Sequence, residues 1–246
     1  MAWTLHTPYK GNIKVIDHGL PVFVAVLMGL ATAVPLIWLS WKIPQQILAD
    51  THLRPALEWS DPAIRGLHWQ DALLVLLVCL CAIGVVMQWG AGVTAWTAFF
   101  YCAVLLLLAR IDARIRLLPD ILTLPLLWLG LLWNAAGMGE LPLEQAVWGA
   151  AAGYIALWLP CALIARVWGR QMMGHGDFKL SASIGAWLGC FGLPFVWLIA
   201  SSFSLLVALI ANRFFGRRLR NPMPFGPGLA LGGILMLFFD WSESFF

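Results

Sequence analysis

Charged side chains are scarce in this chain. Of its 246 residues only 11% are Asp, Glu, Lys or Arg, while 61% are hydrophobic. A soluble domain carries about 25% charged residues, because its surface must face water. The composition therefore excludes an ordinary cytosolic or secreted globular protein, a disordered chain and a basic nucleic-acid-coating domain. It indicates a protein whose outer surface faces lipid, and no nucleic-acid partner is expected.

Paired cysteines are also lacking. The five cysteines are an odd number, none is spaced as CxxC, and four lie inside apolar runs. A structural zinc site needs about four converging nitrogen or sulfur ligands, and a disulfide framework needs an even, loop-placed set. We therefore expect no metal and no cofactor. No cleavable signal peptide is expected either, because the first 20 residues are polar.

Long apolar runs dominate the rest of the chain. A bilayer core about 30 Å thick needs roughly 20 apolar residues per helix, and runs that are continuous rather than alternating favour helices over a barrel. The runs lie near residues 21–41, 72–90, 91–110, 121–137, 145–168, 178–192, 193–212 and 225–240. We expect an all-α, polytopic membrane bundle of about eight transmembrane helices. Residues 1–20 would form a polar N-terminal segment and residues 21–246 one membrane domain.

Lys and Arg alternate regularly between the links that join these runs. Three links are basic, and the links between them carry no Lys or Arg. The basic residues are Arg110, Arg114, Arg116, Arg166, Arg170, Lys179, Arg213, Arg217, Arg218 and Arg220. Because basic links stay in the cytoplasm, they and the polar stretch 43–70 are expected on the cytoplasmic side. Eight runs then place both termini outside, against which Lys10 and Lys14 argue.

Two acidic residues lie at the cytoplasmic ends of apolar runs. Asp112 lies within about one helical turn of the end of the third run. Asp177 follows two glycines in the sequence Gly174-His175-Gly176-Asp177. Taken singly, each has an ordinary explanation: Asp112 as a partner of Arg116 at i,i+4, and Asp177 as a helix N-cap.

Taken together, the two aspartates indicate a catalytic pair. Two carboxyls brought close disfavour double ionisation and share one proton. One carboxylate then activates a water as general base, while its protonated partner polarises a scissile carbonyl. Pro119 and Pro125 follow the first aspartate, and Gly174 and Gly176 precede the second. These residues predict broken helices, which membrane proteins tolerate only around a protected or watery cavity.

Three motifs carry a resemblance to a known family. The segment 112–130, which contains Pro119-Asp120, is similar to the first signature of the type IV prepilin peptidases. The stretch Gly174-His-Gly-Asp177-Phe-Lys179-Leu180 resembles their GxGD signature. Pro224-Phe-Gly-Pro227 resembles their C-terminal PFGP segment, and the three motifs occur in the family's order.

The resemblance implies a fold, an activity and a set of roles. The family is an eight-span aspartic endopeptidase of the bacterial inner membrane. It removes the basic leader of type IV prepilins or pseudopilins on the cytoplasmic side. By matching position, Asp112 and Asp177 are catalytic, and Asp120 is an N-cap or orienting residue. Two glycines would supply conformational freedom, and two basic residues would orient the site or touch the substrate. These four are Gly174, Gly176, Lys179 and Arg116.

The chain departs from the family in residues 43–70. Many members carry two cysteine pairs there, which bind zinc, and they N-methylate the new N-terminus with S-adenosylmethionine. Here the segment has no cysteine, and His52 and His68 alone cannot form a four-ligand zinc site. The sequence predicts a minimal, monofunctional peptidase, a variant that lacks the cytoplasmic cysteine pairs, and it leaves N-methylation open.

Other classes of protein remain as alternatives. A proton- or ion-coupled transporter also uses carboxylates and broken helices, but it predicts carboxylates near mid-bilayer in two related halves. A non-catalytic scaffold of a pilus or secretion machine would use both aspartates as caps. A GxGD peptidase of preflagellins would share the mechanism. Acidic residues near the 43–70 stretch suit a basic leader or simply a solvated loop; they are Asp50, Glu58, Asp61 and Asp71.

Overall fold

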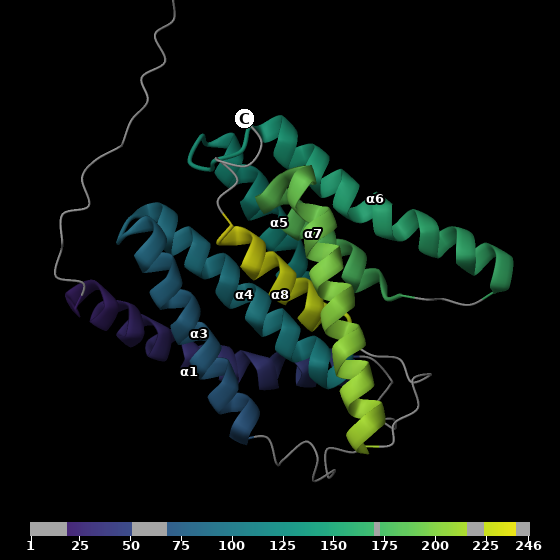
Figure 1. Cartoon of the computed structure of the whole chain (residues 1–246), viewed down its shortest axis with the longest axis horizontal. Helices are drawn as coiled ribbons and strands as arrows, with labels where there is room; N and C mark the ends of the chain where they lie inside the picture. The colour runs from purple at the N-terminus through teal and green to yellow at the C-terminus, as the bar shows by residue number, and fades with distance from the viewer. Residues whose placement is uncertain (1–18, 51–67, 170–172, 216–223, 240–246) are drawn as a thin grey trace, which may run out of the picture.

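The computed structural model describes residues 19–50, 68–169, 173–215 and 224–239, and within them every regular element is an α-helix (Figure 1). The helices are α1 (Gly19–Asp50), α3 (His68–Trp89), α4 (Val93–Ile115), α5 (Asp120–Ala135), α6 (Leu143–Trp168), α7 (His175–Phe215) and α8 (Gly226–Leu237). The prediction of an all-α bundle is confirmed.

Each expected apolar run falls on one of these helices, and two of them share α7. Among the described residues, five helices are long and apolar enough to cross a membrane, namely α1, α3, α4, α6 and α7. Helices α5 and α8 are apolar but shorter. The chain is therefore a multi-pass membrane protein, and the number of eight spans stays a prediction.

Helix α7 contains two helical segments that fold back on each other. The break is at Gly189, whose φ of 71° lies in the left-handed region that glycine adopts without a steric penalty. Trp197 Nε1 donates a hydrogen bond of 2.9 Å to Ser181 Oγ, although 16 helical residues would span about 24 Å. The boundary between the expected runs 178–192 and 193–212 is wrong in position, because residues 192–194 are helical and the chain reverses at Gly189.

The core lies around α4 and α8. In the apolar stretch of α4, 61% of the residues are buried, whereas only 11% are buried in the apolar stretch of α6. Helix α8 lies between α4 and α7, and α6 reaches outward from the bundle (Figure 1). Glycines bring α8 close to α7, because a Cβ at Gly228 would lie 2.7 Å from the Ala200 carbonyl oxygen and one at Gly232 would lie 2.7 Å from that of Val196.

The predicted polar segments lie largely outside the described residues. Of the stretch 43–70, residues 43–50 continue α1 and residues 68–70 begin α3. Residues 51–67, with His52, Glu58 and Asp61, fall outside the description, as do residues 1–18 with Lys10 and Lys14.

Candidate active site

Asp112 lies in the last turn of α4 and is only 4% exposed. The helix ends directly after it, because Arg116 adopts the left-handed conformation and donates its backbone N–H to the Asp112 carbonyl at 2.8 Å. Within the described part of the chain no ion pair joins the carboxylate to Arg116, although the charge of Arg116 interacts with it. Instead, Asp112 Oδ2 accepts a hydrogen bond of 2.9 Å from the backbone N–H of Gly226.

Gly226 is the first residue of α8, so a negative charge on Asp112 faces the positive end of a helix dipole. A Cβ at this position would lie 2.6 Å from Asp112 Oδ2 and 3.0 Å from Asp112 Cβ, so any larger residue would have to displace the Asp112 side chain. Pro227 follows and has no N–H of its own. The sequence placed Gly226 in the PFGP motif but indicated no role for it. The feature that could have indicated a role is a Gly-Pro pair at the start of a helix.

Asp177 lies in the first turn of α7 and is partly buried. The helix begins at His175, so Asp177 is inside the helix and the N-cap interpretation is wrong. Its backbone N–H donates to the Gly174 carbonyl at 3.2 Å. The charge of Asp112 acts electrostatically on Asp177. Two residues that are 65 positions apart in sequence therefore share one end of the bundle.

A close contact between the link after α4 and the first turn of α7 makes this proximity possible. The segment after α4 passes against the first turn of α7, where a Cβ on Gly176 would lie 2.7 Å from Leu118 Cβ. Gly174 also lies beside the site, since a Cβ there would be 3.5 Å from Asp177 Oδ2. Both glycines of the GxGD sequence thus border the aspartate or the loop that faces it.

Asp120 and Lys179 are joined across α5 and α7. Lys179 Nζ lies 2.7 and 2.6 Å from the two Asp120 carboxylate oxygens. The N-cap of α5 is Pro119 and not Asp120, so the N-cap half of that prediction is wrong. The pair is partly exposed, and exposed pairs contribute about 0–1 kcal/mol. Its consequence is positional, because it fixes the start of α5 against the start of α7.

The α5–α7 register continues below this ion pair. One turn further along α7, Ser183 Oγ donates to the Thr123 carbonyl at 2.8 Å. A further turn along, Trp187 Nε1 donates to the Leu126 carbonyl at 2.9 Å. These contacts recur every four residues on α7, as one helix face requires. They hold the segment that carries Asp177 in a fixed register with α5.

The remaining predicted residue, Arg116, is exposed at the end of α4. Within the described ranges, no group of three or more His, Cys, Asp or Glu side chains is placed to hold a metal ion. The fold and site together define a multi-pass helical membrane protein with two interacting carboxyl groups at one end of its bundle.

Comparison with known proteins gives the family. Residues 99–209 match the type IV leader peptidase family. The chain is 44% identical to the prepilin leader peptidase/N-methyltransferase of Dickeya chrysanthemi, covering 72% of this chain and 64% of that protein. It is 41% identical to that of Pectobacterium carotovorum subsp. carotovorum (77% and 70%) and 40% identical to that of Escherichia coli K12 (69% and 74%). The chain belongs to the type IV leader peptidase family.

The comparisons give two further findings. The chain spans less than two thirds of the length of the Dickeya relative. No solved structure matches the chain. The matched residues 99–209 include both aspartates and the Asp120–Lys179 pair, whereas Gly226 lies beyond them.

Proposed function

We propose that this protein is a membrane aspartic endopeptidase that removes the leader peptide of type IV prepilins or pseudopilins. The observation that carries the proposal is the placement of Asp112 and Asp177, which come from two separate motifs, at one end of the bundle and near enough for their charges to interact. Family membership supports it, because the relatives named above are called prepilin leader peptidases.

The two carboxyl groups supply both functions that peptide hydrolysis needs. The ionised carboxyl removes a proton from water as the water attacks the scissile carbonyl carbon. The protonated carboxyl donates a hydrogen bond to the carbonyl oxygen, which stabilises the charge that develops on it. Collapse of the tetrahedral species breaks the C–N bond, and a carboxyl proton passes to the leaving amine. The products are a leader with a new carboxylate and a pilin with a free N-terminus.

The position of the site suits a substrate that is half in the membrane. Asp112 and Asp177 lie at the end of the bundle that carries Arg110, Arg114 and Arg116, and the positive-inside rule supports a position at the cytoplasmic face of the inner membrane. A basic leader would then stay in the cytoplasm, while the apolar helix after the cleavage site remains in lipid. The breaks before α5 and α7 leave non-helical backbone at this level.

A cleavage assay with prepilin in membranes tests the proposal. Asp112→Asn and Asp177→Asn keep the side-chain shape but remove the ionisable group, so each should abolish cleavage while the protein still folds. Asp120→Asn is the matched control and should retain part of the activity, since it loses only the contact with Lys179. An inactive Asp120→Asn beside an active Asp112→Asn would show that the catalytic aspartate is assigned wrongly.

We also propose that the protein is monofunctional. The relatives' names include N-methyltransferase, but residues 43–70 of this chain contain no cysteine. Incubation of cleaved pilin with the enzyme and S-adenosylmethionine, followed by mass spectrometry of the N-terminus, should show cleavage without an added methyl group. Stoichiometric methylation would contradict this second proposal and leave the peptidase proposal intact.

A further inference from the structure

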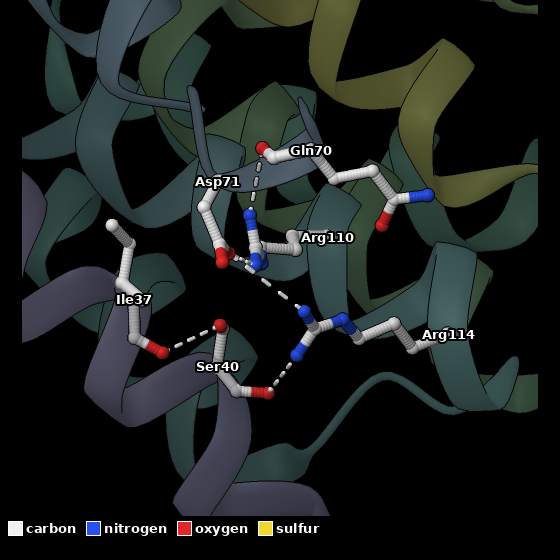
Figure 2. A network of polar contacts seen from close by, with 6 residues as sticks. All are labelled: Ile37, Ser40, Gln70, Asp71, Arg110 and Arg114. Carbon is white, nitrogen blue, oxygen red and sulfur yellow. Dashed lines mark hydrogen bonds and ion pairs between the residues drawn. The ribbon is translucent and has the colours of Figure 1, made fainter. Parts of the chain in front are cut away.

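A charged network lies on the opposite face of α4 from Asp112. Figure 2 shows Arg110 and Arg114 of α4 converging on Asp71, which lies in the first turn of α3. Arg110 forms an ion pair with Asp71 and donates from Nη1 to the Gln70 carbonyl at 2.8 Å. These contacts fasten the last turns of α4 to the first turn of α3.

The second arginine extends the network to α1. Arg114 Nη2 lies 3.9 Å from Asp71 Oδ1, and Nη1 donates to the Ser40 carbonyl at 3.4 Å. The Arg114 guanidinium also lies 3.9 Å from the centre of the Trp41 ring, a cation–π distance. One carboxylate thus joins two arginines, and through them three helices.

Burial makes this network costly to disturb. The side chains of Arg110, Arg114 and Asp71 are 6%, 13% and 26% exposed. A shielded ion pair is screened far less by water and salt than a surface pair. Removal of the Asp71 carboxylate would leave Arg110 and Arg114 close together without a counter-charge. The peptidase mechanism uses none of these three groups.

The geometry of α4 links the network to Asp112. Arg110 precedes Asp112 by two residues and Arg114 follows it by two. At about 100° per residue, each arginine lies roughly 160° around the helix from Asp112, while the two arginines share one face. One side of α4 is therefore fixed to α1 and α3, and the other side presents Asp112 to the N–H of Gly226.

We propose that Asp71, Arg110 and Arg114 are positioning residues that fix the rotation of α4 about its axis and so hold Asp112 in the active site. This inference rests on the proposed peptidase function. A rotation of α4 by 20° would swing the Asp112 carboxylate away from Gly226, and a misplacement of about 1 Å costs a catalyst roughly a hundredfold in rate.

The test uses the full-length enzyme in membrane vesicles with a prepilin substrate. Asp71→Asn should lower kcat roughly 10- to 100-fold per folded molecule with little change in KM, because substrate contacts remain. The charge-swapped double variant Asp71→Arg/Arg110→Asp restores the α3–α4 ion pair and should recover part of that loss, because it also places a like charge near Arg114. Glu140→Gln is the matched control, since Glu140 lies near Trp89 at the other end of the bundle, and it should behave as wild type.

A second measurement reads the rotation without any activity. In a background whose five cysteines are replaced, Ile111→Cys introduces a thiol at a fully buried position, and Ala113→Cys introduces one at an exposed position. A water-soluble maleimide should label only position 113 in the parent. After Asp71→Asn, position 111 should become reactive as α4 turns.

The two readouts separate the possible failures. If the parent enzyme does not cleave prepilin, the peptidase function fails and labelling still tests the rotation. If Asp71→Asn does not fold, Arg114→Gln takes its place, because it keeps the Asp71–Arg110 pair and removes the contacts of Arg114 with Asp71, Ser40 and Trp41. Wild-type kcat together with a protected position 111 in a folded variant would overturn the proposal.

Discussion

The two sides of the bundle are held together by opposite means. On the α1–α3–α4 side, the contact near the site is a largely buried ion pair between Asp71 and Arg110. On the α6–α7–α8 side, glycines let the helix backbones approach closely, and Gly149 of α6 faces the carbonyl of Gly185 directly. Lipid is as apolar as a leucine side chain, so apolar burial alone does not hold helices together in a membrane. Polar contacts and closely packed backbones hold helices together instead. In this chain the polar contact lies on the α1–α3–α4 side and the close backbone packing lies on the α6–α7–α8 side.

The ion pair and the close glycine packing both affect the position of Asp112. The ion pair determines which face of α4 packs against α1 and α3. The glycines of α8 determine how closely the N-terminus of α8 approaches α4. The hydrogen bond from Gly226 to Asp112 forms only if both are in place. We therefore expect substitutions on the two sides of the bundle to have different effects.

The largest expected effect is on the glycine side. Gly149→Val places a branched side chain against the backbone of Gly185, and no rotamer avoids a carbonyl oxygen that lies against the Cβ itself. We expect a loss of about 3 kcal/mol or more of stability and little folded protein. Thermal unfolding in detergent measures it. Gly92→Ala is the control, since nothing lies within 4 Å of that Cβ; equal stability of the two variants would refute the close-packing argument.

A smaller change is expected where the two sides meet. Gly226→Ala adds a Cβ that would lie 2.6 Å from Asp112 Oδ2, so cleavage should fall by about a hundredfold while the protein folds. Gly228→Ala is the matched variant, because its Cβ would instead meet the Ala200 carbonyl. It should lose stability and keep its activity per folded molecule. Prepilin cleavage normalised to folded protein distinguishes the pair, and similar activities would argue against a role for Gly226.

The smallest change is expected at the exposed ion pair. Lys179→Met removes the contact with Asp120 and should cost about 0–1 kcal/mol of stability. Because this pair is partly solvated, its contribution should vanish in 1 M salt, where screening acts over about 3 Å. The contribution of the buried Asp71 pair should persist. Unfolding measured at low and high salt for Lys179→Met and Asp71→Asn makes the comparison, and equal salt dependence would contradict it.

The sequence predicted the helices and the end of the bundle at which the aspartates lie. Long apolar runs give spans directly, and the alternation of basic links placed Asp112 and Asp177 at one end. The position of the turn in α7 was not predictable. Gly192 and Pro194 are also helix breakers, yet both lie within the second helical segment. Gly189 was needed for its positive φ.

The partners of the site residues were not predictable either. Asp71 looked like a residue of a solvated loop, yet it pairs with Arg110 across 39 positions. Asp120 looked like an N-cap, but Pro119 occupies that position and Lys179 takes the carboxylate. Gly226 became a donor to Asp112 only through the packing of α8. Each contact depends on tertiary structure, which no local pattern encodes.

A cross-linking experiment tests most directly whether the two carboxyls that we propose as catalytic lie together. In a background without the native cysteines, Asp112→Cys and Asp177→Cys would be combined in one chain and oxidised in membranes. Ser181→Cys with Trp197→Cys serves as the positive control, since those side chains are in contact across the fold of α7. We expect both pairs to form a disulfide or to be bridged by a short bifunctional thiol reagent. Efficient bridging of the control pair with none at positions 112 and 177 would contradict the proposed site.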